Sequence, residues 1–177
     1  MPRKNSSDPT IDQVVHVMRD VYLPRITSCL DLLTPAQIWW RPNEASNSVG
    51  NLVLHLTGNV RQWIVSGLGG APDVRVRDLE FSERRQLSRR ALSSGLEEAV
   101  REACNVMRAL TAQDLKRTHE IQKYSATGLG AAFHVAEHFS HHAGQIILLT
   151  KMLGGRDLKF TKLPGEKSRK QKKLPTW

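Results

Sequence analysis

Residues 127–155 read TGLGAAFHVAEHFSHHAGQIILLTKMLGG, and they carry a strong helical pattern. Its apolar residues recur at spacings of three and four, which is typical of one face of an α-helix. Phe133, Ile146 and Leu149 mark the side that packs into a core. Thr127 or Gly128 stands where such a helix begins, and the pair Gly154-Gly155 is typical of its end. The pattern therefore predicts one long helix over residues 127–154.

Three further helices are predicted from the same spacing, at about residues 10–33, 47–67 and 94–110. The first begins at Asp8-Pro9-Thr10, or at the capping box Thr10-Ile11-Asp12-Gln13, and we expect Pro24 to kink or interrupt it. A short helical turn follows from Thr34. The second long helix is capped by Asn47 or Ser48.

The third long helix is expected to begin at a capping box formed by Ser94-Gly95-Leu96-Glu97. Residues 71–90 are polar and rich in arginine, and we interpret them as a long connection. Residues 115–126 are ambiguous between loop and short extended segments. Four helices without sustained strand alternation predict an all-α fold, a four-helix bundle that forms one domain over residues 1–160.

The net charge of the chain is +9, from 26 basic and 17 acidic residues. Residues 151–177 contain nine basic and two acidic residues, so most of the excess charge lies at the C-terminal end. We predict that residues 161–177 form a flexible basic tail. Aromatic residues do not alternate with the charges there, which argues against a nucleic-acid partner.

Other functional classes are excluded by composition. No apolar run approaches the roughly 18 residues that span a bilayer, and the N-terminal residues lack the apolar segment of a secretory signal. Cys29 and Cys104 form neither a disulfide framework nor a metal-binding motif. We therefore expect a soluble cytoplasmic protein with reduced thiols.

Four of the seven histidines lie within nine residues of the last helix: His134, His138, His141 and His142. On a helix these side chains share an arc of about 100°. Histidines four residues apart can bind one metal ion, so both His134/His138 and His138/His142 are candidate pairs. His55 interrupts the apolar run Leu52-Val53-Leu54-His55-Leu56 on the second helix and is the best candidate for a third ligand.

Three neutral imidazoles with open coordination positions suit Zn²⁺, which we expect, and also Ni²⁺ or Fe²⁺. A di-iron site of the ferritin type is disfavoured, because no glutamate has a histidine three residues after it. The His-Glu-x-x-His motif of zinc proteases is absent as well.

Two segments resemble a known family. Residues 47–59, NSVGNLVLHLTGN, resemble the second helix of the DinB/YfiT-like metalloenzyme superfamily, and His138-x-x-x-His142-Ala143-Gly144-Gln145 resembles its fourth-helix signature. The paired tryptophans before Arg41-Pro42 and the segment LPGEKS at residues 163–168 are similar to one branch of it. The resemblance covers most of the chain, from about residue 11 to residue 168.

The resemblance implies a four-helix bundle in which His55, His138 and His142 hold one divalent metal ion. His134 and His141 are then left as residues of the surrounding pocket. Ala143 stands where the superfamily commonly has arginine, so any contact of that arginine is missing here. Relatives include transferases and isomerases that use low-molecular-weight thiols, and bundles of this kind often pair into homodimers.

A metal held by three imidazoles is a Lewis acid that can activate water or a thiol. The first functional hypothesis is therefore a metal-dependent enzyme acting on a small molecule, specifically a transferase with a small thiol cosubstrate; metal-assisted hydrolysis is the nearest alternative. The other class is a non-catalytic metal-binding module whose basic tail docks acidic partners or nucleic acid. Candidate catalytic residues are Asn51, Glu137 and His141, and Gln145 is placed to hydrogen-bond near the site.

Overall fold

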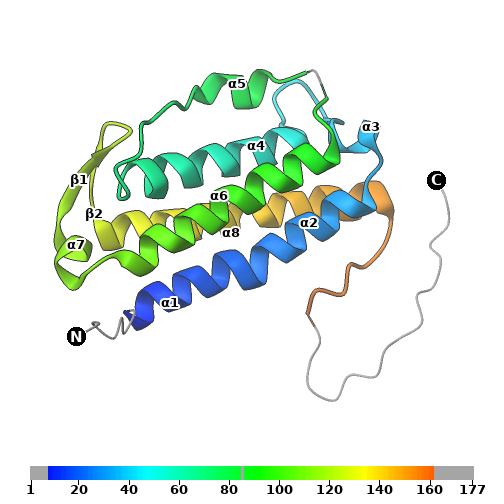
Figure 1. Ribbon diagram of the computed structural model, residues 1–177. Coiled ribbons are helices and arrows are strands. Elements are labelled where there is room, and N and C mark those ends of the chain that lie inside the picture. The colour runs from blue at the N-terminus through cyan, green and yellow to red at the C-terminus, as the bar shows by residue number, and fades with distance from the viewer. Residues whose placement is uncertain (1–7, 85, 162–177) are drawn as a thin grey trace, which may run out of the picture.

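The computed structural model describes residues 8–84 and 86–161. Four long helical rods pack side by side around one apolar core (Figure 1). The first rod is α1 (Pro9–Val15), which continues through the π-helical segment η1 (His16–Tyr22) into α2 (Leu23–Leu32). The second is α4 (Val49–Val60), which continues into the π-helical segment η2 (Arg61–Ser66). The third and fourth are α6 (Arg89–Ala109) and α8 (Gly128–Gly154). The fold is the predicted four-helix bundle.

The first rod accommodates Pro24 without breaking. Before the proline, the backbone hydrogen bonds of the rod change from the α-helical spacing of four residues to the π-helical spacing of five, so that the Leu23 N–H donates to the carbonyl of Met18. Pro24 then lies in the first turn of α2, directly after this π-helical segment. The predicted interruption is thus a local change of helical register, and the rod continues to Leu32.

Side-chain caps begin the helices at several predicted positions. Asp8 accepts from the Thr10 N–H at 2.8 Å. Thr34 forms a capping box that opens α3 (Pro35–Ile38), and Ser48 forms another that opens α4. Thr127 accepts from Gly130 N–H at the start of α8, and Gly155 ends that helix with a left-handed φ of 55°.

The start of the third rod was predicted wrongly. Helix α6 begins at Arg89, capped by Ser88, and Ser94 lies inside it with its hydroxyl donating to the Arg90 carbonyl. Leu92, before the expected start, is buried in the core. The stretch read as a connection contains a short helix, α5 (Arg77–Ser82), which runs alongside α4 (Figure 1).

The ambiguous segment before α8 is a short helix followed by a hairpin. Helix α7 (Ala112–Lys116) leads into β1 (Thr118–Ile121), which pairs antiparallel with β2 (Tyr124–Thr127). Ile121 pairs with Tyr124, so Gln122 and Lys123 form a two-residue turn with φ of 55° and 69°. Both angles are left-handed, as a type I′ turn requires.

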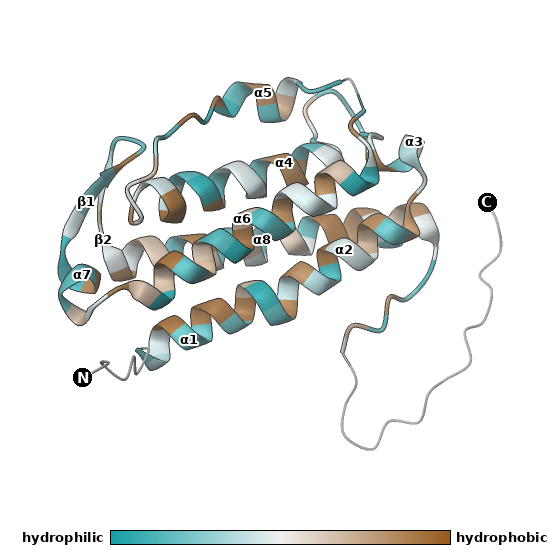
Figure 2. Ribbon diagram, in the orientation of Figure 1, coloured by the Kyte–Doolittle hydropathy of each residue, from teal (hydrophilic) through white to brown (hydrophobic). Residues whose placement is uncertain are grey.

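Each long helix carries apolar and polar residues (Figure 2), and the apolar ones fill the interior, including the free thiols Cys29 and Cys104. A fully buried Leu, Ile or Phe side chain contributes roughly 1.5–3 kcal/mol. Beyond α8, Leu158 and Phe160 pack against the core. Apart from its first residue, the predicted tail lies outside the described residues. Among the helices described, none combines the length and apolarity needed to cross a membrane.

Candidate metal centre

The facing sides of α4 and α8 bring together the three predicted ligand residues. His55 comes from the middle of α4 and is only 5% exposed, while His138 and His142 lie one turn apart on α8. One nitrogen atom from each ring lies within 4.8 Å of the others. Among the residues the structure describes, these are the ones grouped closely enough to hold a metal ion.

The imidazole rings meet edge to face rather than stacking. The interplanar angle is 63° between His55 and His138, 86° between His55 and His142, and 78° between His138 and His142. The Nε2 atoms of His55 and His138 are 2.9 Å apart. Tetrahedral zinc with bonds of about 2.0–2.1 Å places its ligand nitrogens about 3.3 Å apart, so the His55 and His138 nitrogens are close to the required spacing. The three nitrogens together span up to 4.8 Å, so the rings would have to draw closer around such an ion.

The environment favours neutral imidazoles. Burial, followed by the neighbouring His142 and His55, lowers the pKa of His138 to about 3. Burial also lowers the pKa of His142, although its hydrogen bond to Gln145 opposes the shift. Because neutral imidazole is the metal-binding form, both rings keep a lone pair available near neutral pH.

Two of the three imidazoles are oriented through their other ring nitrogen. The Nδ1–H of His55 donates to Glu80 Oε2 at 2.9 Å, and the Nδ1–H of His142 donates to Gln145 Oε1 at 2.7 Å. Each bond selects the tautomer that leaves Nε2 unprotonated. Ligand histidines in metalloproteins are held in this way by carboxylates and carbonyls. Gln145 thus forms a hydrogen bond to one of the clustered histidines, as predicted.

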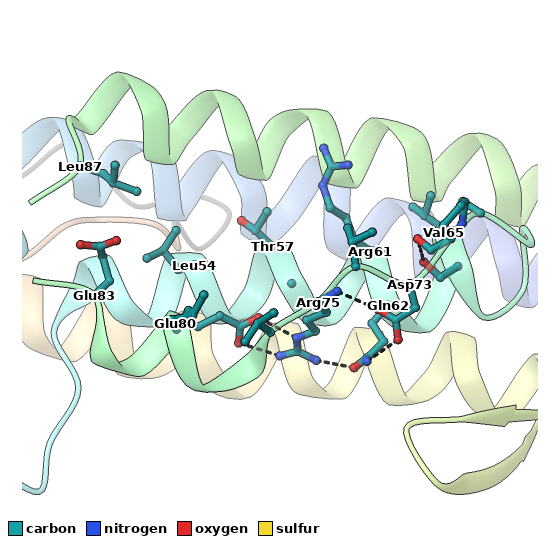
Figure 3. Close-up of a pocket in the computed structure, with 17 residues that line it drawn as sticks. Leu54, Thr57, Arg61, Gln62, Val65, Asp73, Arg75, Glu80, Glu83 and Leu87 are labelled. Atoms are coloured by element: carbon teal, nitrogen blue, oxygen red, sulfur yellow. Dashed lines mark hydrogen bonds and ion pairs between the residues drawn. The ribbon is translucent and has the colours of Figure 1, made fainter. Parts of the chain in front are cut away.

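Glu80 is itself part of a buried network (Figure 3). Arg75 donates to both carboxylate oxygens, from Nε at 2.6 Å and from Nη2 at 2.8 Å. Its Nη1 donates to Gln62, which in turn donates to Asp73. Burial alone would raise the pKa of Glu80, but Arg75, with a smaller effect of His55, lowers it overall. Glu80 is therefore an anion at neutral pH.

Two residues of α4 create the place for this network. Asn51 donates to the Glu80 backbone carbonyl at 2.8 Å and so holds α5 against α4. Gly58 lies one turn after His55, and a Cβ atom there would overlap the Glu80 carboxylate and lie 2.8 Å from Arg75 Nε. A groove of about 420 Å³, lined by residues of α4 and η2 and by residues of the segment 71–87, includes Gly58, Arg75 and Glu80 in its wall (Figure 3).

Sequence reasoning missed Glu80 and Arg75. Both belong to a polar stretch without helical periodicity, where an acidic and a basic residue carry no distinguishing pattern. One signal was available: Gly58 is an isolated glycine inside a helical pattern, which suggests a close approach of another group. It marks the helix face that Glu80 covers.

The remaining candidates divide between cavity and surface. The ring of His134 contacts that of Trp63 in a tilted arrangement, with centroids 3.8 Å apart, and Asn59 Nδ2 lies 3.3 Å from His134 Nε2. His141 is exposed and receives a hydrogen bond from Gln145 at 3.2 Å. Glu137 is exposed on the outside of α8.

Asn51 is buried at the α4–α5 contact. The catalytic roles suggested for Asn51, Glu137 and His141 remain predictions.

A cavity of about 680 Å³ adjoins the histidine cluster. His55, His138 and His134 form part of its wall, together with Trp63 and Tyr124. Two further residues that line it, Arg77 and Lys123, come from α5 and from the hairpin turn. A small molecule in this space would therefore lie directly against the histidines.

Comparison with known structures supports the fold. YfiT from Bacillus subtilis, a probable metal-dependent hydrolase with an unusual four-helix bundle topology, matches with a TM-score of 0.70 at 19% identity, over 87% of this chain and 93% of YfiT. The DinB-like protein YjoA from Bacillus subtilis matches at 0.62 and 18% identity, over 82% and 95%. A DinB-like protein from Bacillus cereus matches at 0.62 and 16% identity, over 76% and 87%.

At these identities the comparisons show the fold, and they confirm the resemblance to DinB and YfiT proteins. No curated protein matches the chain. The sequence profile of a family described as protein of unknown function, DUF1572, matches residues 8–167. The chain therefore belongs to the DUF1572 family, with the four-helix bundle fold of DinB/YfiT-like proteins.

Proposed function

We propose that the chain is a metal-dependent enzyme in which His55, His138 and His142 hold one divalent metal ion, which we expect to be zinc. The observation that carries the proposal is the convergence of three imidazole nitrogens within 4.8 Å, from two helices of the bundle. Hydrogen bonds that two of the rings donate to Glu80 and Gln145 support it, because they orient the rings as in metal sites.

The protein residues have distinct tasks in this proposal. Glu80 and Gln145 keep the protons of His55 and His142 on Nδ1, away from the ligand side. The adjoining cavity would hold the substrate against the histidines. A bound divalent ion supplies Lewis acidity, which favours the deprotonated form of a nucleophile.

The finer proposal is the transfer of a small thiol to an electrophilic substrate in this cavity. It is supported by the resemblance to a superfamily with thiol-dependent members. We expect that the use of a thiol extends to this branch. Metal-assisted hydrolysis is the second candidate, and the description of YfiT as a probable metal-dependent hydrolase favours it. A cytoplasmic location and a homodimer belong to the same proposal.

Metal content is the first test. Elemental analysis of the purified chain should find about one divalent ion per chain, and His55→Ala, His138→Ala and His142→Ala should each lose it. His16→Ala is the matched control, because His16 is exposed on the first rod and pairs with Asp20. Full metal occupancy in the three variants would exclude the assigned site.

The second test separates the reactions. The metal-loaded chain is assayed with a panel of low-molecular-weight thiols and an electrophile, and in parallel with ester and amide substrates. Thiol-dependent turnover that His142→Ala loses would support transfer, and thiol-independent turnover would support hydrolysis. A metal-loaded chain that is inactive in every assay would favour the non-catalytic binding module. In that case nucleic-acid binding is measured before and after deletion of residues 167–177, and its loss would identify the tail as the docking element.

A further inference from the structure

The cavity beside the histidines has an unbalanced charge. Arg75, Arg77 and Lys123 line it, and no aspartate or glutamate is among its lining residues. Arg75 is neutralised by Glu80. Within residues 8–84 and 86–161, neither Arg77 nor Lys123 forms an ion pair with an acidic side chain. Two uncompensated cations therefore face a space that also adjoins the histidine cluster.

The local structure keeps both cations near the site. The guanidinium of Arg77 lies over the Phe81 ring, 4.9 Å from its centroid, and that ring lies 4.7 Å from the ring of His55. Lys123 occupies the second position of the hairpin turn with φ of 69°. A lysine there is less favourable than glycine by about 1 kcal/mol. The fold thus tolerates some backbone strain at the residue that brings an ammonium group to the cavity.

Aromatic rings form one wall of the same space. Tyr124, which is 63% exposed, stacks on Trp63 with ring centroids 6.2 Å apart, and the tilted ring of His134 lies 3.8 Å from that of Trp63. His134 continues the row to His138 at 5.5 Å. The row of rings runs from the exposed Tyr124 to the histidine cluster and gives this side of the cavity an aromatic surface.

Buried polar atoms also lie along this wall. Asn59 Oδ1 and Trp63 Nε1 have no hydrogen-bond partner among the described residues, although both residues line the cavity. Buried polar atoms without a partner are rare in proteins.

We propose that this cavity binds a small organic anion, with its carboxylate or phosphate group held by Arg77 and Lys123 and its flat apolar part against Tyr124 and Trp63. The inference names the substrate class of the proposed function and rests on it. A divalent ion at the histidines would increase the positive potential of the cavity, so an anionic substrate is attracted to the reacting group. Arg77 and Lys123 act as binding residues for the anionic end.

Isothermal titration calorimetry on the full zinc-loaded chain tests this with three probes of one shape. Naphthoate and naphthyl phosphate carry the two head groups, and naphthamide is the neutral match. At least one of the anions should bind about tenfold or more tightly than naphthamide, and the tighter anion identifies the preferred head group. Equal affinity for the anions and the amide, or no binding of any probe, would overturn the proposal.

Variants locate the anion. Arg77→Gln and Lys123→Gln should each weaken binding of the preferred anion about tenfold and leave naphthamide binding and metal content unchanged. Lys116→Gln, at an exposed lysine of α7, is the control and should change neither. A preference for the anion that survives both substitutions would mean that another group, such as the metal, holds it, and would contradict the proposal.

The same titrations on metal-free protein separate the two proposals. If the purified chain binds no metal, the proposed function fails. The anion proposal is still supported if the metal-free chain binds an anionic probe about tenfold more tightly than naphthamide and if Arg77→Gln and Lys123→Gln each weaken that binding. It fails if the metal-free chain shows no such preference.

Discussion

The orientation of His55 depends on a single carboxylate, that of Glu80. Glu80→Gln preserves the shape of the side chain but replaces the anion that accepts the His55 proton and pairs with Arg75. We expect zinc affinity, measured by competition with a chromophoric chelator, to fall by about 10–100-fold. Glu97→Gln, at an exposed glutamate of α6, should leave it unchanged. Wild-type affinity in a folded Glu80→Gln variant would show that the carboxylate does not support the site.

The absence of a side chain at Gly58 leaves space for the Glu80–Arg75 ion pair. Ala is normally the better residue inside a helix, by about 1 kcal/mol. At Gly58, however, the added methyl group would overlap the Glu80 carboxylate, and we expect Gly58→Ala to destabilise the fold by about 1–3 kcal/mol in urea denaturation. Gly95→Ala is the control, because no neighbouring atom lies within 4 Å of its Cβ position and it should be neutral or stabilising. Equal effects at both positions would contradict the close contact.

At the scale of elements, the short helix α5 carries Glu80 and is tied to α4 by Asn51. Asn51→Ala removes a buried donor to the Glu80 carbonyl and a partner of Ser48. We expect a loss of about 1–3 kcal/mol in the free energy of unfolding, with weaker zinc binding because α5 is less firmly held. The neighbouring Asn47→Ala is the control. A stable, metal-binding Asn51→Ala variant that lacks only activity would instead favour the catalytic role predicted for Asn51.

Elements with repeating local signals could be predicted from sequence, and elements defined by distant contacts could not. The rods followed from their apolar spacing and from caps such as Ser48 and Thr127. The start of α6 was missed because Ser94 and Glu97 imitate a capping box inside a helix. The histidines of α8 could be predicted because they share one helix face. Glu80 could not, because it lies 25 residues after His55 in the sequence and reaches it only through the folded course of the connection after α4.

For the whole molecule, a metal that binds only the folded chain must raise its stability. Zinc at about 100 times its dissociation constant adds about 2.7 kcal/mol. For a domain of this size we expect a rise in Tm of roughly 5–10 °C, since each kcal/mol shifts it by about 2–4 °C. Differential scanning calorimetry should show the rise in the wild type, its reversal by a chelator, and no rise in His142→Ala. An equal rise in that variant would place the ion elsewhere.

In the proposed function, His55, His138 and His142 hold one metal ion between α4 and α8. Anomalous diffraction at the zinc edge, from crystals of the zinc-loaded chain, tests it most directly. We predict one strong peak within about 2.0–2.1 Å of a nitrogen atom of each of the three rings. A peak ligated by another residue set, such as His134 with His138 or His141 with Gln145, would contradict it, and so would a zinc-loaded crystal without a peak between the two helices.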